Sequence, residues 1–413
     1  MADFSLQDQI EEKLVNNSAD TSAEQWWTSF VLGGIILFAM FDFGLRLFYH
    51  PNIFESPYRS WIATSVIDYP KGMPKPQIVI FGSSLVVATV NDGDAATLGE
   101  EVDGTTHHRS FTLERALADA KNPSAAPRTH SFAIGGQMAS DSYAILRTLY
   151  NGEDAIVKNR FLPPQTIVWG IAPRDFLDAT FTDPYSSTTV AYLDKIKYNH
   201  DSLGSRGFSF WRKMEELIDR TSCAYNQRDH FVALQKQTMF GLLGALGIID
   251  AGEIGTVKTP QALLSIARRE LPEDNGLRQW MVKPQTQATT QFEDNSKEYT
   301  ARYNPFKQKL FDTQLSYFEK FLKLANQRHI KVLLVNMPLT EDNLKLIPEG
   351  KYQTYLEAVK AAAAANNAAF VDYNDGKTFT REFFNDPVHL NGYGSQRFFR
   401  LVADEIKKDA SPQ

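Results

Sequence analysis

Two short motifs near the two ends of the chain contain residue types that can perform nucleophilic catalysis. Residues 82–85 read Gly-Ser-Ser-Leu and follow an apolar run, while Asp386 and His389 stand three residues apart close to the C-terminus. A serine hydroxyl is a poor nucleophile and needs a neutral imidazole as its base, and the imidazole needs an acceptor that fixes its tautomer. We therefore predict Ser84 as the nucleophile, His389 as its base and Asp386 as the acceptor.

Each motif alone has a simpler interpretation, in which its polar residues only cap helices. A glycine directly after a strand allows a tight turn, and a serine at the start of the next helix is a common N-cap. The same helix start favours developing negative charge, which suits a nucleophile. We expect Ser83 to supply a cap or a backbone N–H beside Ser84, and Asn391 to support the C-terminal motif. The catalytic interpretation requires both motifs to meet at one site.

Five short apolar runs rich in β-branched residues predict the strands of a buried sheet. They lie at 77–81, 130–134, 166–170, 331–336 and 369–372. Helical patterns alternate with them at 112–120, 141–150, 306–327, 351–366 and 392–408. This alternation predicts an α/β fold, a parallel sheet with helices on both faces. In such sheets reactive groups gather at the carboxyl ends of the strands, where both motifs would meet.

A long apolar segment near the N-terminus predicts a membrane anchor. Residues 26–49 follow a polar and acidic leader, 1–25, and are long enough to cross a bilayer core of about 30 Å, which takes roughly 20 helical residues. Asp42 and Arg46 are spaced i,i+4 and can pair on one helix face. A buried core helix and a cleaved signal peptide are the alternatives, but the leader lacks a basic region and a small-residue cleavage site. We predict an uncleaved single-span anchor in the lipid bilayer.

The rest of the chain divides by composition. Residues 50–76 contain five prolines and predict a linker. Residues 77–413 predict one domain built on the sheet. Within it, residues 178–305 break the alternation of strands and helices and predict a helical insertion that caps the site. We therefore expect one α/β domain that is carried by an anchor and a linker.

Charge and composition argue against several other classes of function. The formal net charge is −6 and the basic residues are scattered, so no basic face for nucleic acid is predicted. The single cysteine, Cys223, rules out an internal disulfide. His107 and His108, with Asp103 nearby, lack a third ligand at useful spacing, and no glycine-rich phosphate loop occurs in the sequence. We predict neither a metal site nor a cofactor.

The two motifs together resemble the SGNH hydrolase superfamily, whose members are also called GDSL-like. Residues 82–85 match its first block, G-D-S-L, and residues 386–390 match its last block, D-x-x-H-L. Residues 133–137 resemble its second block, a strand that runs into glycines. The resemblance implies a three-layer flavodoxin-like parallel sheet of the SGNH hydrolase type. It also implies that the backbone N–H of Gly136 lines an oxyanion hole, and that the serine, histidine and aspartate carry out acyl chemistry.

The third block departs from the superfamily pattern. The family normally has G-x-N-D after its third strand, where the asparagine donates to the oxyanion, but residues 170–176 contain no asparagine. Arg174 occupies roughly that position, so the resemblance implies that Arg174 supplies the missing charge-assisted hydrogen bond. An ion pair with Asp175 is the alternative. Loss of one oxyanion donor costs about 3 kcal/mol in known enzymes, so the role of Arg174 bears directly on catalytic efficiency.

A narrower resemblance covers the anchor as well. A single N-terminal span, a G-S-S block and a late strand that ends in Asn-Met-Pro-Leu at 336–339 look like the membrane-tethered branch of the superfamily, which decorates teichoic acids with D-alanine or acetylates alginate. The resemblance implies an extracytoplasmic domain on the cytoplasmic membrane, a glycan acceptor and a membrane-bound O-acyltransferase as partner. The slight excess of arginines after the span favours the opposite orientation. Ester hydrolysis and non-catalytic support of the acyltransferase are the alternative functions.

Overall fold

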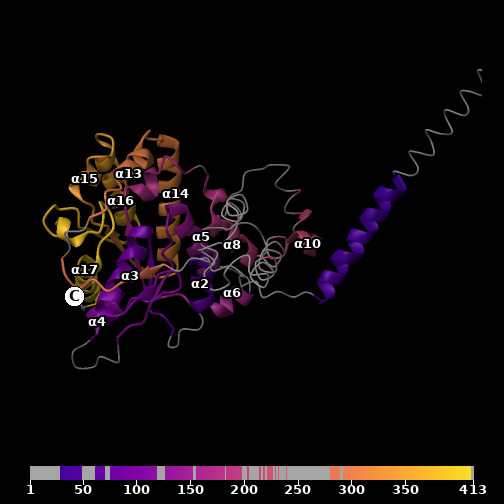
Figure 1. Cartoon of the computed structure of the whole chain (residues 1–413), viewed down its shortest axis with the longest axis horizontal. Coiled ribbons are helices and arrows are strands. Elements are labelled where there is room, and N and C mark those ends of the chain that lie inside the picture. The colour runs from indigo at the N-terminus through magenta and orange to yellow at the C-terminus, as the bar shows by residue number, and fades with distance from the viewer. Residues whose placement is uncertain are drawn as a thin grey trace, which may run out of the picture. The chain divides into compact units, whose positions relative to one another are not determined.

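The structure is a computed structural model of the chain, drawn in Figure 1. It describes residues 28–48, 61–69, 75–118, 126–151, 155–181, 183–197, 202–203, 280–288 and 292–410, together with single residues and short stretches between 214 and 239. The chain forms two compact units. The small unit comprises Met1–Asn52 and Phe208–Val232, and the large unit comprises Ile53–Gly207 and Ala233–Gln413.

A five-stranded parallel sheet forms the centre of the large unit. Its strands are β1 (Ile78–Phe81), β3 (Thr129–Ser131), β4 (Thr166–Ile171), β6 (Lys331–Asn336) and β7 (Ala369–Asp372). They lie in the order β3-β1-β4-β6-β7, and every neighbouring pair is parallel. Counted along the chain this is the order 2-1-3-4-5 of flavodoxin-like folds. The predicted α/β fold is confirmed, and each of the apolar runs supplies one strand.

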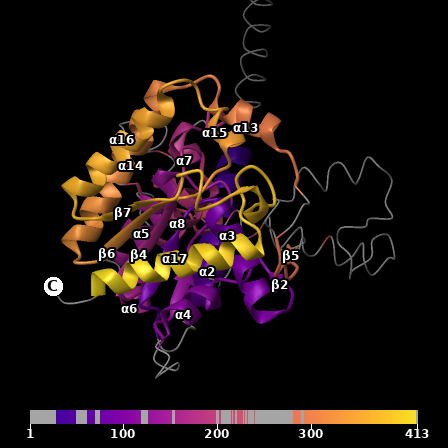
Figure 2. The ribbon, with the colours of Figure 1, turned by 90° about the vertical axis from the view of Figure 1, so that its left-hand side faces the viewer.

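Two helical layers cover the sheet (Figure 2). In one layer α3 (Ser84–Leu98), α4 (Phe111–Leu117) and α17 (Gly392–Ala410) pack on one another. In the other, α14 (Gln308–Gln327) packs on α5 (Ala139–Tyr150) and on α16 (Lys351–Ala365). The first and the last long helix of the domain therefore lie side by side. This contact brings the segment after β1 close to the C-terminal end of the chain.

Shorter elements connect these layers. In the large unit they are α2 (Trp61–Asp68), α6 (Ala155–Arg160), α7 (Arg174–Leu177), α8 (Thr188–Lys197), α13 (Ser296–Tyr303), α15 (Glu341–Leu344), the 3-10 turns η3 (Pro184–Ser186) and η4 (Arg381–Phe383), and the antiparallel pair β2 (Val102–Asp103) and β5 (Met281–Val282). The small unit contains the helix Thr28–Phe48 and α10 (Cys223–Asn226).

The segment predicted as a linker departs from that prediction, because α2 lies within it. Ile62 and Val66 are one helical turn apart and both are buried. Tyr69, directly after the helix, is fully buried and its ring lies 5.6 Å from that of Phe132 and 5.3 Å from that of Phe161. The prolines that suggested a linker all lie outside α2. This part of 50–76 therefore belongs to the core of the large unit.

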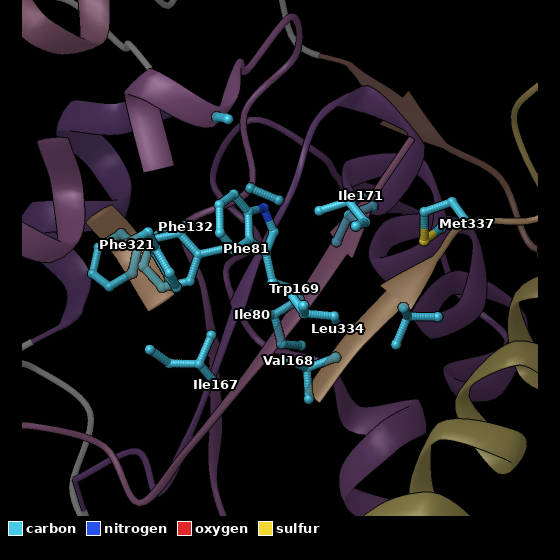
Figure 3. Close-up of a cluster of buried hydrophobic side chains, with 14 of the residues drawn as sticks. Ile80, Phe81, Phe132, Ile167, Val168, Trp169, Ile171, Phe321, Leu334 and Met337 are labelled. Atoms are coloured by element: carbon cyan, nitrogen blue, oxygen red, sulfur yellow. The ribbon is translucent and has the colours of Figure 1, made fainter. Parts of the chain in front are cut away.

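Aromatic packing holds the carboxyl half of the central strands (Figure 3). Trp169 of β4 lies against Phe321 of α14, with 4.1 Å between ring centroids. Phe81, the last residue of β1, contacts both Phe321 and Phe132 at 5.3 and 5.9 Å. Truncation of such a buried ring costs about 3–5 kcal/mol. The turn that follows Phe81 is thus built on a rigid support.

Only part of the predicted insertion 178–305 falls within the described residues. Its described elements in the large unit are η3, α8, β5 and α13, and residues 241–279 lie outside the description. β5 pairs with β2, so the insertion returns to the domain beside the residues that follow α3. In addition, α8 packs on α5 and α13 packs on α7. The role of the insertion as a cap stays a prediction.

The helix Thr28–Phe48 of the small unit has the length and composition of a membrane span. It contains 21 residues and reaches a mean hydropathy of 1.9. Asp42 and Arg46 lie on one face, with Arg46 Nε 3.8 Å from Asp42 Oδ2. The leader 1–25 and residues 26–27 lie outside the described residues. Insertion of this helix into a membrane stays a prediction.

Candidate active site

The turn after β1 places Ser84 at the carboxyl edge of the sheet. Gly82 has φ +149°, and a Cβ atom there would lie 2.3 Å from Cγ2 of Val86 and 2.7 Å from the carbonyl oxygen of Gly170. Glycine is therefore required for the chain to turn so tightly from β1 into α3. Ser83 is the N-cap residue and Ser84 is the first residue of α3. The positive end of the helix dipole favours negative charge beside the Ser84 hydroxyl.

Ser84, His389 and Asp386 lie in series with hydrogen-bonding distances. The Ser84 hydroxyl is 2.9 Å from Nε2 of His389, and Nδ1 of His389 is 2.6 Å from Oδ2 of Asp386. Asp386 also accepts the backbone N–H groups of Val388 and His389 through Oδ1, both at 2.8 Å. The carboxylate thus assigns the proton to Nδ1 and leaves the lone pair of Nε2 facing the hydroxyl. This arrangement can generate a serine nucleophile.

Asn391 holds the C-terminal loop that carries the histidine. It is fully buried, its Oδ1 accepts the N–H of Gly394 at 2.9 Å, and its Nδ2 donates to the carbonyl of Glu382 at 2.8 Å. Phe384 and Leu390 form an isolated bridge on the same loop. Asn391 therefore contacts backbone on both sides of the loop, and its place in the structure is that of a positioning residue.

The loop after β3 brings Gly136 to the same edge of the sheet. The N–H of Ile134 donates to the carbonyl of Gly82 at 3.0 Å, and the N–H of Gly82 donates to Oε1 of Gln137 at 3.1 Å. Gly136 lies between these two contacts with φ +79°, a backbone conformation that disfavours a side chain. The glycine turn and the nucleophile turn are therefore hydrogen-bonded neighbours. Donation from the Gly136 N–H to an oxyanion stays a prediction.

Arg174 is tied to acidic and backbone groups beside the glycine turn. Its Nη2 lies 2.9 Å from Oδ2 of Asp178, and its Nη1 donates to the carbonyl of Gln137 at 3.2 Å. The contact with Asp175 is longer, 3.7 Å. A Cβ atom on Gly136 would lie 3.6 Å from Nη2, so the guanidinium is close to the expected oxyanion position. The structure thus gives Arg174 a closer ion pair than the one expected from the sequence.

Asp175 and Ser83 form a buried polar pair behind the nucleophile. Oδ2 of Asp175 accepts the N–H of Ala172 at 3.0 Å. Burial raises the pKa of Asp175 to about 6, while Arg174 and the Ser83 hydroxyl act to lower it. The Ser83 hydroxyl and Oδ1 of Asp175 are both buried. These groups lie behind the turn and support it.

A pocket of about 560 Å³ opens at the Ser84 hydroxyl. Its lining combines Ser84, His389 and Asp386, the candidate triad, with aromatic, amide and charged groups. The other lining residues are Trp61, Val87, Ala88, Asp92, Trp280, Val282, Lys283, Gln285, Glu293 and Asn385. A larger cavity of about 730 Å³ lies at the opposite edge, lined by residues such as Gln77, Thr166 and Lys331 from the start of the strands. The smaller pocket is the candidate active site, because ligands of parallel sheets bind at the carboxyl ends of the strands.

Trp61 and Trp280 form one wall of this pocket and were not predicted from the sequence. Their rings stack with 5.9 Å between centroids and 20° between planes. A Cβ on Gly135 would lie 2.5 Å from the Trp61 ring, and one on Gly104 would lie 2.4 Å from the Trp280 ring. Small residues therefore let both indoles approach the backbone. The wall comes from α2 and from the residue before β5, so no local pattern marks it.

Asp92 is a second carboxyl group in the pocket that sequence reasoning missed. Ser84, Ala88 and Asp92 follow one face of α3 at i, i+4 and i+8, and all three line the pocket. Burial raises the pKa of Asp92 to about 7, and Asn385 Nδ2, which donates to Oδ1 at 3.2 Å, acts to lower it. Because Asn385 directly precedes Asp386, Asp92 is linked to the loop that carries the triad. Its i+8 spacing from Ser84 on a predicted helix was the sequence signal that could have identified Asp92.

The histidines outside the site have structural partners. Nε2 of His107 lies 2.7 Å from Asp94, and Nε2 of His108 lies 2.9 Å from the Thr64 hydroxyl. Burial lowers the pKa of His108 well below its usual value and that of His130 to about 3, so both stay neutral. In the part of the chain that the structure describes, no cluster of three or more residues could hold a metal ion.

Comparison with known proteins gives a partial family match and distant structural neighbours. A family model described as "Protein of unknown function (DUF1574)" matches residues 261–403, about a third of the chain, which include Asp386 and His389 but not Ser84. No curated protein matches the sequence.

Three solved structures resemble the chain at low identity. A proposed acylhydrolase from Bacteroides fragilis has 13% identity and a TM-score of 0.32, and the alignment covers 83% of this chain and 94% of that one. A GDSL-like lipase from Bacteroides thetaiotaomicron has 12% identity and a TM-score of 0.31, over 80% and 88%. A carbohydrate acetylesterase from Sinorhizobium meliloti has 12% identity and a TM-score of 0.29, over 81% and 99%.

Proposed function

We propose that this protein is a membrane-anchored serine acyl-transfer enzyme of the SGNH type. The observation that carries the proposal is the series formed by Ser84, His389 and Asp386, which connects residues from opposite ends of the chain. The series opens into a pocket at the carboxyl edge of a flavodoxin-like sheet. If His389 were only a surface residue and Ser84 only a helix cap, nothing would require their side chains to lie 2.9 Å apart at this edge of the sheet.

The reaction is a double displacement. Ser84 Oγ attacks the carbonyl carbon of an acyl ester while its proton passes to Nε2 of His389. The bond from the carbonyl carbon to the ester oxygen breaks, the leaving alcohol takes the proton from Nε2, and an acyl ester remains on Ser84. A second hydroxyl compound then gives its proton to Nε2 and attacks this ester, after which Ser84 leaves and recovers the proton. Asp386 stabilises the imidazolium in both steps.

Backbone donors are the main stabilisers of the oxyanion in this proposal. The N–H of Ser84 belongs to the open first turn of α3, and the N–H of Gly136 lies on the neighbouring glycine turn. Arg174 stabilises this turn through the carbonyl of Gln137 and adds positive charge close to it. Donors fixed in advance around developing charge typically supply about 3 kcal/mol each.

The anchor, the acceptor and the partner form the finer part of the proposal. The helix Thr28–Phe48 has the length and hydropathy of a single span and would hold the domain on the extracytoplasmic side of the cytoplasmic membrane. Stacked indoles together with amide and carboxylate groups in the pocket suit a polyhydroxyl acceptor such as a cell-envelope glycan. A membrane-bound O-acyltransferase would supply the acyl group.

Labelling of the nucleophile tests the proposal directly. The full chain in detergent should react with a fluorescent fluorophosphonate, and Ser84→Ala and His389→Ala should lose the label. Ser142→Ala is the matched control, because the Ser142 hydroxyl is buried in α5 and has no hydrogen-bond partner within the described residues. An unlabelled wild-type chain, or a label that persists in Ser84→Ala, would overturn the proposal and leave a non-catalytic domain.

The acceptor separates transfer from hydrolysis. After acylation of Ser84 with 4-nitrophenyl acetate, a transferase loses the acetyl group slowly to water as acetate, and faster to an added oligosaccharide as a sugar ester. An esterase turns over quickly in water alone, with no gain from the sugar. The measured quantity is the rate of 4-nitrophenol release after the first turnover, with and without the oligosaccharide.

A further inference from the structure

We propose that the anchor helix holds part of the insertion at the bilayer surface, through a contact between Asp42 and residues 221–224 and an adjoining apolar helix face that lies among the lipid headgroups. This inference rests on the proposed membrane insertion of Thr28–Phe48 and concerns only the small unit. It is independent of the chemistry at Ser84. It gives the polar pair of the anchor a partner within the chain.

Asp42 is shielded on a helix whose neighbouring side chains are open. It is 8% exposed, whereas the adjacent Phe41 and Phe43 are 58% and 62% exposed. Its Oδ1 accepts the Ser222 hydroxyl at 2.7 Å and the backbone N–H of Ala224 at 2.7 Å. The apolar side chains of the helix are thus left for lipid, and the acid is covered by another part of the chain.

Arg46 completes the contact one turn further along the helix. It pairs with Asp42 and also donates to the carbonyl oxygen of Thr221. Ser222 in turn accepts the N–H of Tyr225 at 3.1 Å, so the captured segment is ordered by its own hydrogen bonds as well. Charged side chains within membrane spans are costly unless they are paired or hydrogen-bonded. Here both charges of the pair have protein partners.

The residues just before this contact form an apolar helix face. Met214, Leu217 and Ile218 are helical, recur at the spacing of one helix face, and are 38%, 54% and 41% exposed. In the sequence, Glu215 and Glu216 separate Met214 from Leu217, and charged residues flank the group on both sides. Apolar residues at helical spacing among charged ones are the sequence pattern of helices that lie in the membrane interface.

Continuity with the anchor makes lipid the occupant of this face. Asp42 lies six residues before the last described residue of the helix, Phe48, which is about 9 Å along the axis. The 21 residues of the helix extend about 32 Å, which matches a hydrocarbon core of about 30 Å. Arg46, two residues before Phe48, therefore lies near the headgroup boundary, and Asp42 lies about one turn deeper. Thr221 touches Arg46 there, and Leu217 and Ile218 precede Thr221 by about one turn. The apolar face is therefore held at the depth of the acyl–headgroup boundary.

The consequence is an additional attachment of the large unit to the membrane. The chain leaves the large unit at Gly207, passes through the small unit, and re-enters the large unit at Ala233. The insertion is thus a second covalent connection between the large unit and the small unit, in addition to the segment after the anchor.

Spin-label depth measurements on the full chain in lipid nanodiscs test the inference. Cys223 is the single cysteine, but burial and the nearby Asp42 raise the pKa of its thiol, so slow alkylation there would not report lipid. We therefore suggest a nitroxide on Leu217→Cys in a Cys223→Ser background. The measurement compares the collision rate of the nitroxide with oxygen, which concentrates in lipid, and its collision rate with a water-soluble nickel chelate.

At position 217 we expect the nitroxide to be more accessible to oxygen than to the nickel chelate. In Asp42→Leu the ratio of oxygen to nickel accessibility should fall several-fold, towards the value of a water-exposed site. Asp42→Asn keeps a hydrogen-bond acceptor and should retain most of the ratio. Phe43→Ala is the matched control, because Phe43 is exposed on the same helix. Nickel accessibility in the parent chain, or an immobilised label that neither reagent reaches, would overturn the inference, the latter in favour of a protein interface. Loss of the chain from nanodiscs would instead contradict the anchor, and fluorophosphonate labelling reports Ser84 separately.

Discussion

The loops after β1 and after β4 both place polar side chains at the carboxyl edge of the sheet, yet they differ in access and in pairing. Beside the first loop, the side chains of His389 and Asp386 are 23% and 15% exposed, and one nitrogen of the imidazole faces the Ser84 hydroxyl. Beside the second, Arg174 and Asp178 are 9% and 2% exposed and lie 2.9 Å apart. Beside the first loop, the imidazole of His389 and the hydroxyl of Ser84 can still react with a ligand. Beside the second loop, the charges of Arg174 and Asp178 pair with each other.

An acid next to a base is therefore not by itself a catalytic site. Asp386 uses its contacts to orient an imidazole that opens onto the pocket. Asp178 accepts from Arg174 and also from Arg302, at 2.6 Å, and so joins α7 to α13. Buried charges of this kind hold neighbouring elements in register, and the removal of one partner is costly. In the proposed enzyme, the loop after β1 contributes the chemistry and the loop after β4 contributes support.

The largest expected effect comes from the acid of the first loop. Asp386→Asn should lower kcat for a generic acetyl ester by about 10⁴-fold, because an amide N–H facing Nδ1 favours the wrong imidazole tautomer. Asp175→Asn is the matched change at the second loop, where burial already raises the pKa of the carboxyl group to about 6, and its effect on kcat should be far smaller. Steady-state kinetics at pH 7.5 compare the two. Equal losses in both variants would contradict the division between the loops.

The second effect is on stability. Asp178→Ala leaves the buried guanidinium of Arg174 without its closest partner and should lower the free energy of unfolding by about 3–5 kcal/mol. Glu341→Ala is the control, because its pair with Lys345 is exposed and should change stability by less than about 1 kcal/mol. Urea denaturation followed by tryptophan fluorescence measures both. A stable Asp178→Ala variant with a much reduced kcat would instead assign Arg174 to the oxyanion.

The sheet and the triad could be predicted from the sequence because both have local signals. A strand buried on two faces is a short unbroken apolar run, and β4 and β6 follow this rule along nearly their whole length. Ser84 and His389 were found because a glycine turn after a strand and a D-x-x-H motif are each contained in a few residues. The parallel topology then required the two motifs to meet at one edge.

The rest of the site depends on contacts between distant segments and carries no local signal. Trp61 reaches the pocket because α2 packs into the core, which the flanking prolines concealed. The pairing of Arg174 with Asp178 rather than with its neighbour Asp175 depends on side-chain directions on α7. Asp92 had a helical spacing from Ser84, but its burial follows only from the packing of α17 and the C-terminal loop.

The third effect is a pH dependence set by Asp92. Its pKa is raised to about 7 by burial, while an unfolded aspartate titrates near 3.9. Between about pH 4 and 7 the unfolded chain releases this proton and the folded chain retains it, so the contribution of Asp92 to stability falls as pH rises. Asp92→Asn removes this dependence and should gain roughly 2–3 kcal/mol relative to wild type between pH 5 and 8. Urea denaturation at both pH values measures the change, and a constant difference would contradict it.

The smallest expected effect concerns the aromatic wall that faces the first loop. Trp61→Ala removes a ring stacked on Trp280 and should raise KM for an acetylated oligosaccharide by about tenfold, in line with about 1–1.5 kcal/mol for one aromatic contact. The kcat for 4-nitrophenyl acetate should stay unchanged, because this small ester does not need the wall. Trp61→Phe keeps a ring and should restore most of the affinity. A loss of kcat on the small ester, with KM unaltered, would mean that Trp61 acts through its contact with Gly135 to hold the glycine turn rather than to bind the acceptor.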